Sequence, residues 1–87
     1  LPMSRRSRDL RYKYNMEVWE YDKLYTEQKG RCAICQVKRS PLDIDHSHNT
    51  GKVRGLLCSN CNMGSGFLRD SSVITNNATK YLRKHND

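Results

Sequence analysis

The chain has 87 residues, with 16 Lys or Arg against 9 Asp or Glu and a formal net charge of +7. A single small domain of this length buries only about 60–65% of its unfolded surface, and a hydrophobic content of 36% predicts that it needs a further source of stability. No segment approaches the roughly 18 apolar residues of a membrane span, and no secretion leader is visible. We therefore expect an intracellular protein whose charge serves a polyanion such as nucleic acid, the alternative being a merely basic, soluble surface.

The first 15 residues predict a basic arm. Leu1-Pro2 precede Met3 and are interpreted as residues left by cloning. The segment from Ser4 to Lys13 has five cations against one acid, Asp9, for a local net charge of +4. It is either a disordered solubilising tail or a set of contacts to DNA phosphates. The candidate phosphate-binding residues of this arm are Arg5, Arg6, Arg8 and Arg11.

The domain itself is expected to span residues 16–87 and to begin with a helix at residues 16–29. Its predicted buried face follows the i, i+3, i+4, i+7 spacing of a helix. Gly30 stands where a glycine commonly ends a helix. The residues of this face are Tyr21, Leu24, Tyr25 and Gln28.

Four cysteines follow as two C-x-x-C pairs, Cys32 with Cys35 and Cys58 with Cys61, separated by 22 residues. Two such turns can complete a tetrahedron of thiolates around Zn²⁺. Two disulfides would need an oxidising compartment, and a redox motif would need only one pair. The spacing therefore predicts structural zinc, which contributes on the order of 10 kcal/mol in small domains, so the metal-free chain should be largely unfolded.

A β-hairpin is predicted between the two cysteine pairs. Residues 42–45 alternate apolar and acidic side chains, residues 46–51 have the composition of a loop, and residues 52–57 can return as a second strand. A short helix is expected at residues 59–68. A last helix begins after Asp70 or Ser71 as N-cap. Its predicted apolar face consists of Val73, Ile74, Asn77, Ala78, Tyr81 and Leu82.

Zinc leaves Asp45, His46 and Asn62 without a role. Asp45 and His46 end the first strand, and Asn62 lies on the helix that follows the second strand. If that helix packs across the hairpin, the carboxylate and the amide oxygen can converge on Mg²⁺, a cation that prefers oxygen ligands. His46 points the other way and can accept a proton from water. This division of roles fits metal-assisted phosphodiester hydrolysis, although a solvated histidine and a capping asparagine are the alternative.

The runs Gly30–Cys35 (GRCAIC) and Asp45–Asn62 (DHSHNTGKVRGLLCSNCN) resemble the phage recombination endonuclease VII family of His-Me finger (HNH-like, ββα-metal) nucleases. The resemblance implies a small α+β zinc-stabilised domain: a hairpin and a helix form the ββα-metal core, flanked by N- and C-terminal helices. It implies structural zinc on the four cysteines, catalytic Mg²⁺ on Asp45 and Asn62, with Mn²⁺ as a substitute, and His46 as general base. His48 matches a family histidine expected beside the scissile phosphate. A phage protein would act in the host cytoplasm.

The sequence departs from the broader HNH pattern at two positions. Asn62 stands where a histidine often binds the metal, and Arg54 stands near the place of the asparagine that orients the base, so we expect a backbone carbonyl to hold His46. Arg54 and Lys52 lie on the strand beside the proposed site and are candidate phosphate contacts, the alternative being exposed edge charges.

The leading hypothesis is a metal-dependent endonuclease that nicks or cuts duplex or branched DNA, as a monomer or weak dimer and without a membrane partner. One alternative is a non-catalytic zinc-ribbon-like module that binds nucleic acid. Another is a zinc-stabilised protein-interaction domain, which would not retain DNA at low salt.

Overall fold

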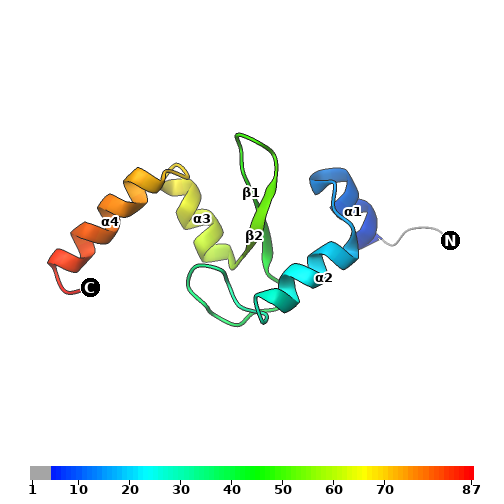
Figure 1. The fold of residues 1–87 in the computed structure, drawn as a ribbon, viewed down its shortest axis with the longest axis horizontal. Helices are drawn as coiled ribbons and strands as arrows, with labels where there is room; N and C mark the ends of the chain where they lie inside the picture. Colours follow the sequence, from blue (N-terminus) through cyan, green and yellow to red (C-terminus); the bar gives the residue numbers. More distant parts are fainter. Residues whose placement is uncertain (1–4) are drawn as a thin grey trace.

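A computed structural model of the chain describes residues 5–87. In chain order these residues form α1 (Arg5–Tyr14), α2 (Val18–Glu27), β1 (Asp43–His46), β2 (Val53–Leu57), α3 (Ser59–Phe67) and α4 (Ser72–Lys84). The two strands form an antiparallel hairpin between the helix pairs, with α1 and α2 on one side and α3 and α4 on the other (Figure 1). The α+β class and the hairpin between the cysteine pairs are thus confirmed.

The basic arm is a helix over residues 5–14, so the disordered-tail interpretation is wrong there; Leu1-Pro2, Met3 and Ser4 lie outside the described residues. Helix α1 packs against α2 through a single buried residue, Leu10, which is 7% exposed. Two of its arginines pair with acids of the following segment, Arg6 with Asp22 at 3.2 Å and Arg11 with Glu17 at 3.1 Å. Because α1 is tied to α2 in this way, the folded unit begins before residue 16.

Helix α2 confirms the predicted N-terminal helix but is shorter at both ends. Its first turn is closed by Glu20, whose carboxylate accepts a hydrogen bond from the backbone N–H of Glu17 at 3.1 Å. Beyond its last residue, Lys29 adopts a left-handed φ of 56° and Gly30 one of 69°. The N–H of Gly30 reaches the Tyr25 carbonyl at 2.9 Å, as in a Schellman ending. Lys29 therefore takes the C′ position predicted for Gly30.

Two polar side chains of α2 attach it to the hairpin. The Tyr21 hydroxyl donates to the Leu42 carbonyl at 2.6 Å and accepts from the Leu42 N–H at 3.2 Å. The Gln28 amide donates to the Leu56 carbonyl and accepts from the Leu56 N–H, both at 2.9 Å. These bonds satisfy backbone groups of the hairpin and of the segment leading into it, and they fix how α2 lies against the core.

The core lies between the cysteine pairs and the hairpin. Leu56 and Cys32 are fully buried, and Leu42, Leu57 and Cys58 are 3–4% exposed. The predicted face of α2 covers this cluster, together with Ile44 and Cys61: Tyr21, Leu24 and Tyr25. A chain with so few fully buried residues depends on additional bonds for its stability.

The hairpin contains a β-bulge next to the predicted site. Asp45 lies opposite Gly55, but His46 lies opposite Val53, so Arg54 is the extra residue of β2. In a regular ladder, side chains of successive residues point to opposite faces, and Arg54 would face away from Asp45. A bulge turns the extra side chain, which places Arg54 within reach of Asp45.

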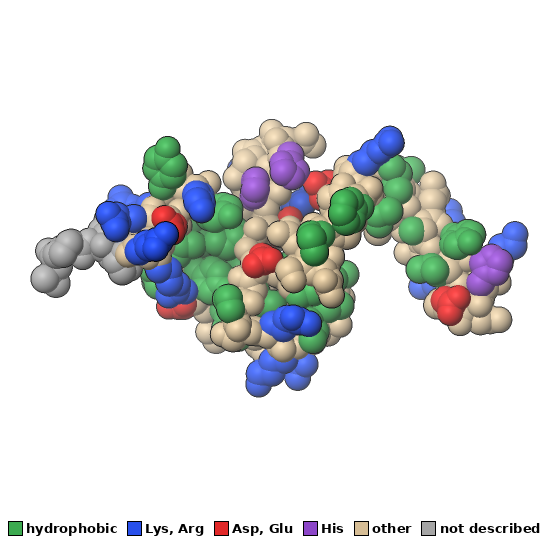
Figure 2. Space-filling model, turned by 180° about the vertical axis from the view of Figure 1, so that it is seen from behind, with side chains coloured by type: hydrophobic (Ala, Val, Ile, Leu, Met, Phe, Trp, Pro, Cys, Tyr) green, Lys and Arg blue, Asp and Glu red, His purple; other side chains and the backbone are tan. Residues whose placement is uncertain are grey.

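Helices α3 and α4 meet at a tight junction. Arg69, in a left-handed conformation at φ 60°, follows α3, and the N–H of Asp70 returns to the Ser65 carbonyl at 2.9 Å. Ser71 then caps α4, its hydroxyl accepting from the N–H of Ile74 at 3.2 Å. The predicted apolar face of α4 is present but open to solvent, with Val73 68% exposed (Figure 2). In the described part of the chain, no helix is long and apolar enough to cross a membrane.

Candidate functional site

The four cysteines converge on one point at the base of the hairpin. Their sulfur atoms all lie within 4.8 Å of one another. The backbone N–H of Ile34 points at the sulfur of Cys32, and that of Cys61 points at the sulfur of Cys58, each at 3.4 Å. Within residues 5–87 this is the one cluster of three or more His, Cys, Asp or Glu side chains arranged to hold a metal.

The donor set of this cysteine cluster fits zinc. Zn–S bonds of about 2.3 Å in a tetrahedron place the sulfur atoms about 3.8 Å apart, and the sulfur atoms of Cys35 and Cys58 are 3.7 Å apart.

The thiol ionisation also indicates a cation. Burial raises the pKa of Cys32, but hydrogen bonds from backbone N–H groups outweigh burial and bring that pKa down to about 6. Burial and the neighbouring thiols raise the pKa of Cys61 to about 12. Four thiolates this close repel one another unless a divalent cation neutralises them.

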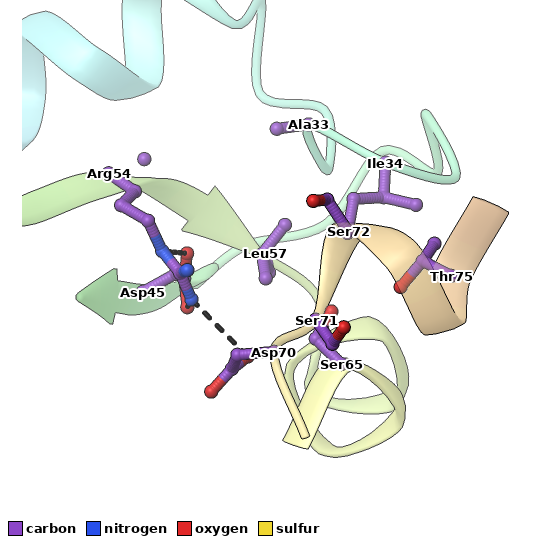
Figure 3. A pocket seen from close by; sticks show the side chains of 11 residues that line it. Ala33, Ile34, Asp45, Arg54, Leu57, Ser65, Asp70, Ser71, Ser72 and Thr75 are labelled. Carbon is purple, nitrogen blue, oxygen red and sulfur yellow. Dashed lines mark hydrogen bonds and ion pairs between the residues drawn. The ribbon is translucent and has the colours of Figure 1, made fainter. Parts of the chain in front are cut away.

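A second cluster lies on the other side of β2. The Arg54 guanidinium binds both carboxylate oxygens of Asp45, with Nε 2.7 Å from Oδ2 and Nη2 2.9 Å from Oδ1 (Figure 3). The hydrogen bond to Asp45 is the main reason that the pKa of Arg54 is raised above its ordinary value. The Asp45 side chain is 14% exposed and that of Arg54 is 41% exposed, so the pair lies at the edge of solvent.

Asp70 adds a second carboxylate to this pair. Its Oδ1 lies 3.4 Å from Arg54 Nη2, and its Oδ2 lies 3.5 Å from Nε2 of His48. Asp45, His48, Arg54 and Asp70 are called the polar cluster below. Three of them, without His48, line a pocket of about 360 Å³ that the start of α4 also borders (Figure 3).

His46 lies beside the polar cluster and is flanked by two rings. The centre of its ring is 5.1 Å from that of His48 and 5.8 Å from that of Tyr14, which meets it edge-on at 61°. The two histidines are adjacent over the hairpin in Figure 2. Within residues 5–87 the contacts of the His46 ring are these aromatic ones, and the expected hydrogen bond from a backbone carbonyl is not among them.

The remaining predicted residues lie farther from the polar cluster. Asn62 is on α3, which packs against both strands. Its backbone N–H bonds to Cys58, but within residues 5–87 its side chain does not contact Asp45. Ser65, three residues along the same helix, lines the pocket with Asp45, which puts Asn62 on the corresponding side of α3. Lys52 is exposed at the start of β2.

Sequence reasoning missed Tyr14 and Asp70. Tyr14 was interpreted as an arm residue, and Asp70 as a possible helix cap. Their roles depend on contacts across 32 and 16–22 residues of sequence, to His46, Arg54 and His48. No local pattern reports such contacts. The one available signal is that Ser71 competes for the cap, which leaves Asp70 free for another role.

Comparison with known proteins identifies the family. The model of the recombination endonuclease VII family matches residues 7–84, so the chain belongs to this family.

Two curated relatives are each called Gene 59 protein. The one from Mycobacterium phage D29 is 47% identical over 75 residues, covering 82% of this chain and 46% of that protein. The one from Mycobacterium phage L5 is 46% identical over 73 residues, covering 79% of this chain and 44% of that protein. The chain thus spans less than half the length of these relatives. No solved structure matches it.

Proposed function

We propose that the chain is a divalent-metal-dependent DNA endonuclease with a ββα-metal, His-Me finger core. The observation that carries this proposal is the grouping of Asp45, His46 and His48 on one end of a hairpin, beside Arg54. Its support is that the hairpin and α3 are joined by a cysteine cluster suited to zinc, in a chain of the endonuclease VII family.

Asp45 and Asn62 would hold the catalytic cation. A carboxylate and an amide oxygen are ligands suited to Mg²⁺, with Mn²⁺ as a substitute. When bound, the cation would stabilise the charge that develops on the phosphate and on the leaving oxygen. Both carboxylate oxygens of Asp45 are bonded to Arg54, so Arg54 must give up at least one of them when the cation binds.

His46 would accept the proton of the attacking water. A neutral imidazole is suited to this task near neutral pH. Tyr14 and His48 restrict the orientation of its ring from two sides, which replaces the backbone carbonyl that we expected. His48 would act beside the scissile phosphate, and it is 73% exposed along its side chain, as such contact requires.

DNA binding would use cations that remain accessible. Arg54 and Lys52 lie on the strand at the site, and Arg5 and Arg8 lie on α1 without an ion pair among residues 5–87. Arg6 and Arg11 are paired with acids, so their share of phosphate binding should be smaller. Contacts of this kind bind duplex or branched DNA regardless of base sequence and weaken with salt.

The test is nicking of supercoiled plasmid with and without added Mg²⁺. A chelator is avoided because it would also remove zinc. Wild-type protein should nick the plasmid only with Mg²⁺, and His46→Ala should lower the rate by about 10²–10⁴-fold. The matched control is His85→Ala, since His85 lies at the end of α4 and contacts only Tyr81 there. A wild type that never nicks, or a His46→Ala protein that nicks equally fast, overturns the proposal.

A non-catalytic module that binds nucleic acid is the second candidate. The observation in its favour is that Asp45 is fully engaged by Arg54, an arrangement that needs no catalytic cation. This candidate predicts DNA retention at low salt without Mg²⁺-dependent nicking. A protein-interaction domain predicts neither.

A further inference from the structure

Asp70 joins two site residues that come from different parts of the hairpin. His48 belongs to the loop after β1, and Arg54 is the bulged residue of β2. One oxygen of Asp70 faces each of them, at 3.5 and 3.4 Å. Asp70 itself comes from the junction of α3 and α4, outside the hairpin and the cysteine pairs.

The backbone holds Asp70 in a fixed place. Its φ is 50° and that of Arg69 is 60°, two successive left-handed residues that are not glycine and that cost conformational energy. The N–H of Asp70 is bonded to Ser65, and the cap of α4 is supplied by Ser71. The carboxylate of Asp70 is thus spared from capping α4 and points toward Arg54 (Figure 3).

Arg54 is shared unequally between two acids. Its Nη2 lies 2.9 Å from Asp45 and 3.4 Å from Asp70, so the same nitrogen faces both. A divalent cation on Asp45 would compete with Arg54 for the Asp45 oxygens, because a cation and a guanidinium seek the same lone pairs. Arg54 could then remain at the site by shortening its bond to Asp70.

We propose that Asp70 is a positioning residue of the nuclease site: it holds His48 and Arg54 toward the phosphate, and it retains Arg54 when a divalent cation takes Asp45. This inference rests on the proposed function. It assigns to the α3–α4 junction a part in metal loading that the motif residues alone do not provide.

The test measures Mn²⁺ binding, from the electron paramagnetic resonance signal of free Mn²⁺, in zinc-loaded protein. Asp70→Asn keeps a residue that tolerates left-handed backbone and removes the charge that attracts Arg54. Outer-shell changes cost metal affinity about 10–100-fold, and we expect about tenfold weaker Mn²⁺ binding. Asp43→Asn removes the same charge from the exposed start of β1 and is the matched control, with an expected change of about twofold or less.

A double-mutant cycle separates the action through Arg54 from plain charge attraction. In the Arg54→Ala background, Asp70→Asn should change Mn²⁺ binding by about twofold or less, since nothing then competes for Asp45. An equal loss in both backgrounds, or no loss in either, overturns the assignment. The nicking rate of Asp70→Asn should recover as Mn²⁺ is raised, and a deficit that stays constant also contradicts it.

The two proposals fail in different ways. If wild-type protein neither binds Mn²⁺ nor nicks plasmid, the proposed function is wrong and Asp70 has no site to position. If wild-type protein does both and Asp70→Asn matches it throughout, only the role of Asp70 is wrong.

Discussion

The cysteine cluster and the polar cluster share β2 but are built in opposite ways. Cys32 and Cys58 are 0% and 4% exposed, and the four sulfur atoms come from two short turns. The polar cluster draws on the hairpin and the α3–α4 junction, and the side chain of His48 is 73% exposed. The first cluster is closed and suited to holding the fold, whereas the second is open and suited to exchanging partners.

This difference predicts where substitutions will affect stability. Structural metal sites contribute on the order of 10 kcal/mol, whereas exposed ion pairs contribute about 0–1 kcal/mol. Loss of a cysteine should therefore unfold the chain, while loss of a polar-cluster residue should leave it folded. Between these limits lie the hydrogen bonds that attach α2 to the hairpin.

The largest expected effect is that of Cys58→Ser. Cys58 is a buried member of the cluster, and its sulfur accepts the N–H of Cys61 at the start of α3. Because the metal replaces much of the missing core, we expect loss of bound zinc and of the cooperative thermal transition in far-UV circular dichroism. A Cys58→Ser protein that melts cooperatively at the wild-type temperature would contradict the role assigned to the cluster.

The next effect is that of Gln28→Ala. This substitution leaves both backbone groups of Leu56 without their partner, and we expect a loss of about 2–4 kcal/mol in urea unfolding. Gln36→Ala is the control, because Gln36 makes only an exposed bond at 3.4 Å to Ala33. Equal losses for the two variants would show that the attachment of α2 is not what stabilises the hairpin.

Tyr21→Phe should cost less, about 1–2 kcal/mol, because it removes the hydroxyl that bonds to Leu42. Burial raises the pKa of Tyr21 above its ordinary value of 10. The neutral hydroxyl thus favours the folded state: its contribution is complete below pH 10 and declines as pH rises through the raised pKa.

Wild-type protein should therefore lose more stability above pH 10 than Tyr21→Phe does, as measured by urea unfolding across that range. Tyr12→Phe is the control, since Tyr12 is 91% exposed. A Tyr21→Phe protein with the wild-type alkaline profile would rule out this linkage.

The smallest effect on stability is expected for Arg54→Ala. Its ion pairs with Asp45 and Asp70 are partly solvated, so we expect a loss of about 1 kcal/mol or less together with a large loss of nicking. A loss of stability comparable with that of Gln28→Ala would mean that the polar cluster is structural, and the contrast between the two clusters would fail.

The sequence predicted the closed cluster better than the open one. The cysteines are recognisable because each pair is set by a turn of four residues, and the i, i+3, i+4, i+7 face of α2 was correct because helical periodicity is local. The orientation of Arg54 depends on a bulge, and the place of Asp70 depends on a left-handed junction; neither has a sequence signature. Helix α1 was missed because it buries only Leu10.

The most direct test of the account compares plasmid nicking by wild type and Asp45→Asn in preparations matched for zinc content and melting temperature. We predict that both bind zinc equally and melt within a few degrees of each other, and that only the wild type nicks plasmid when Mg²⁺ is added. Asp45→Asn protein that nicks at the wild-type rate, or that loses its zinc, would contradict the division between a structural cysteine cluster and a catalytic polar cluster.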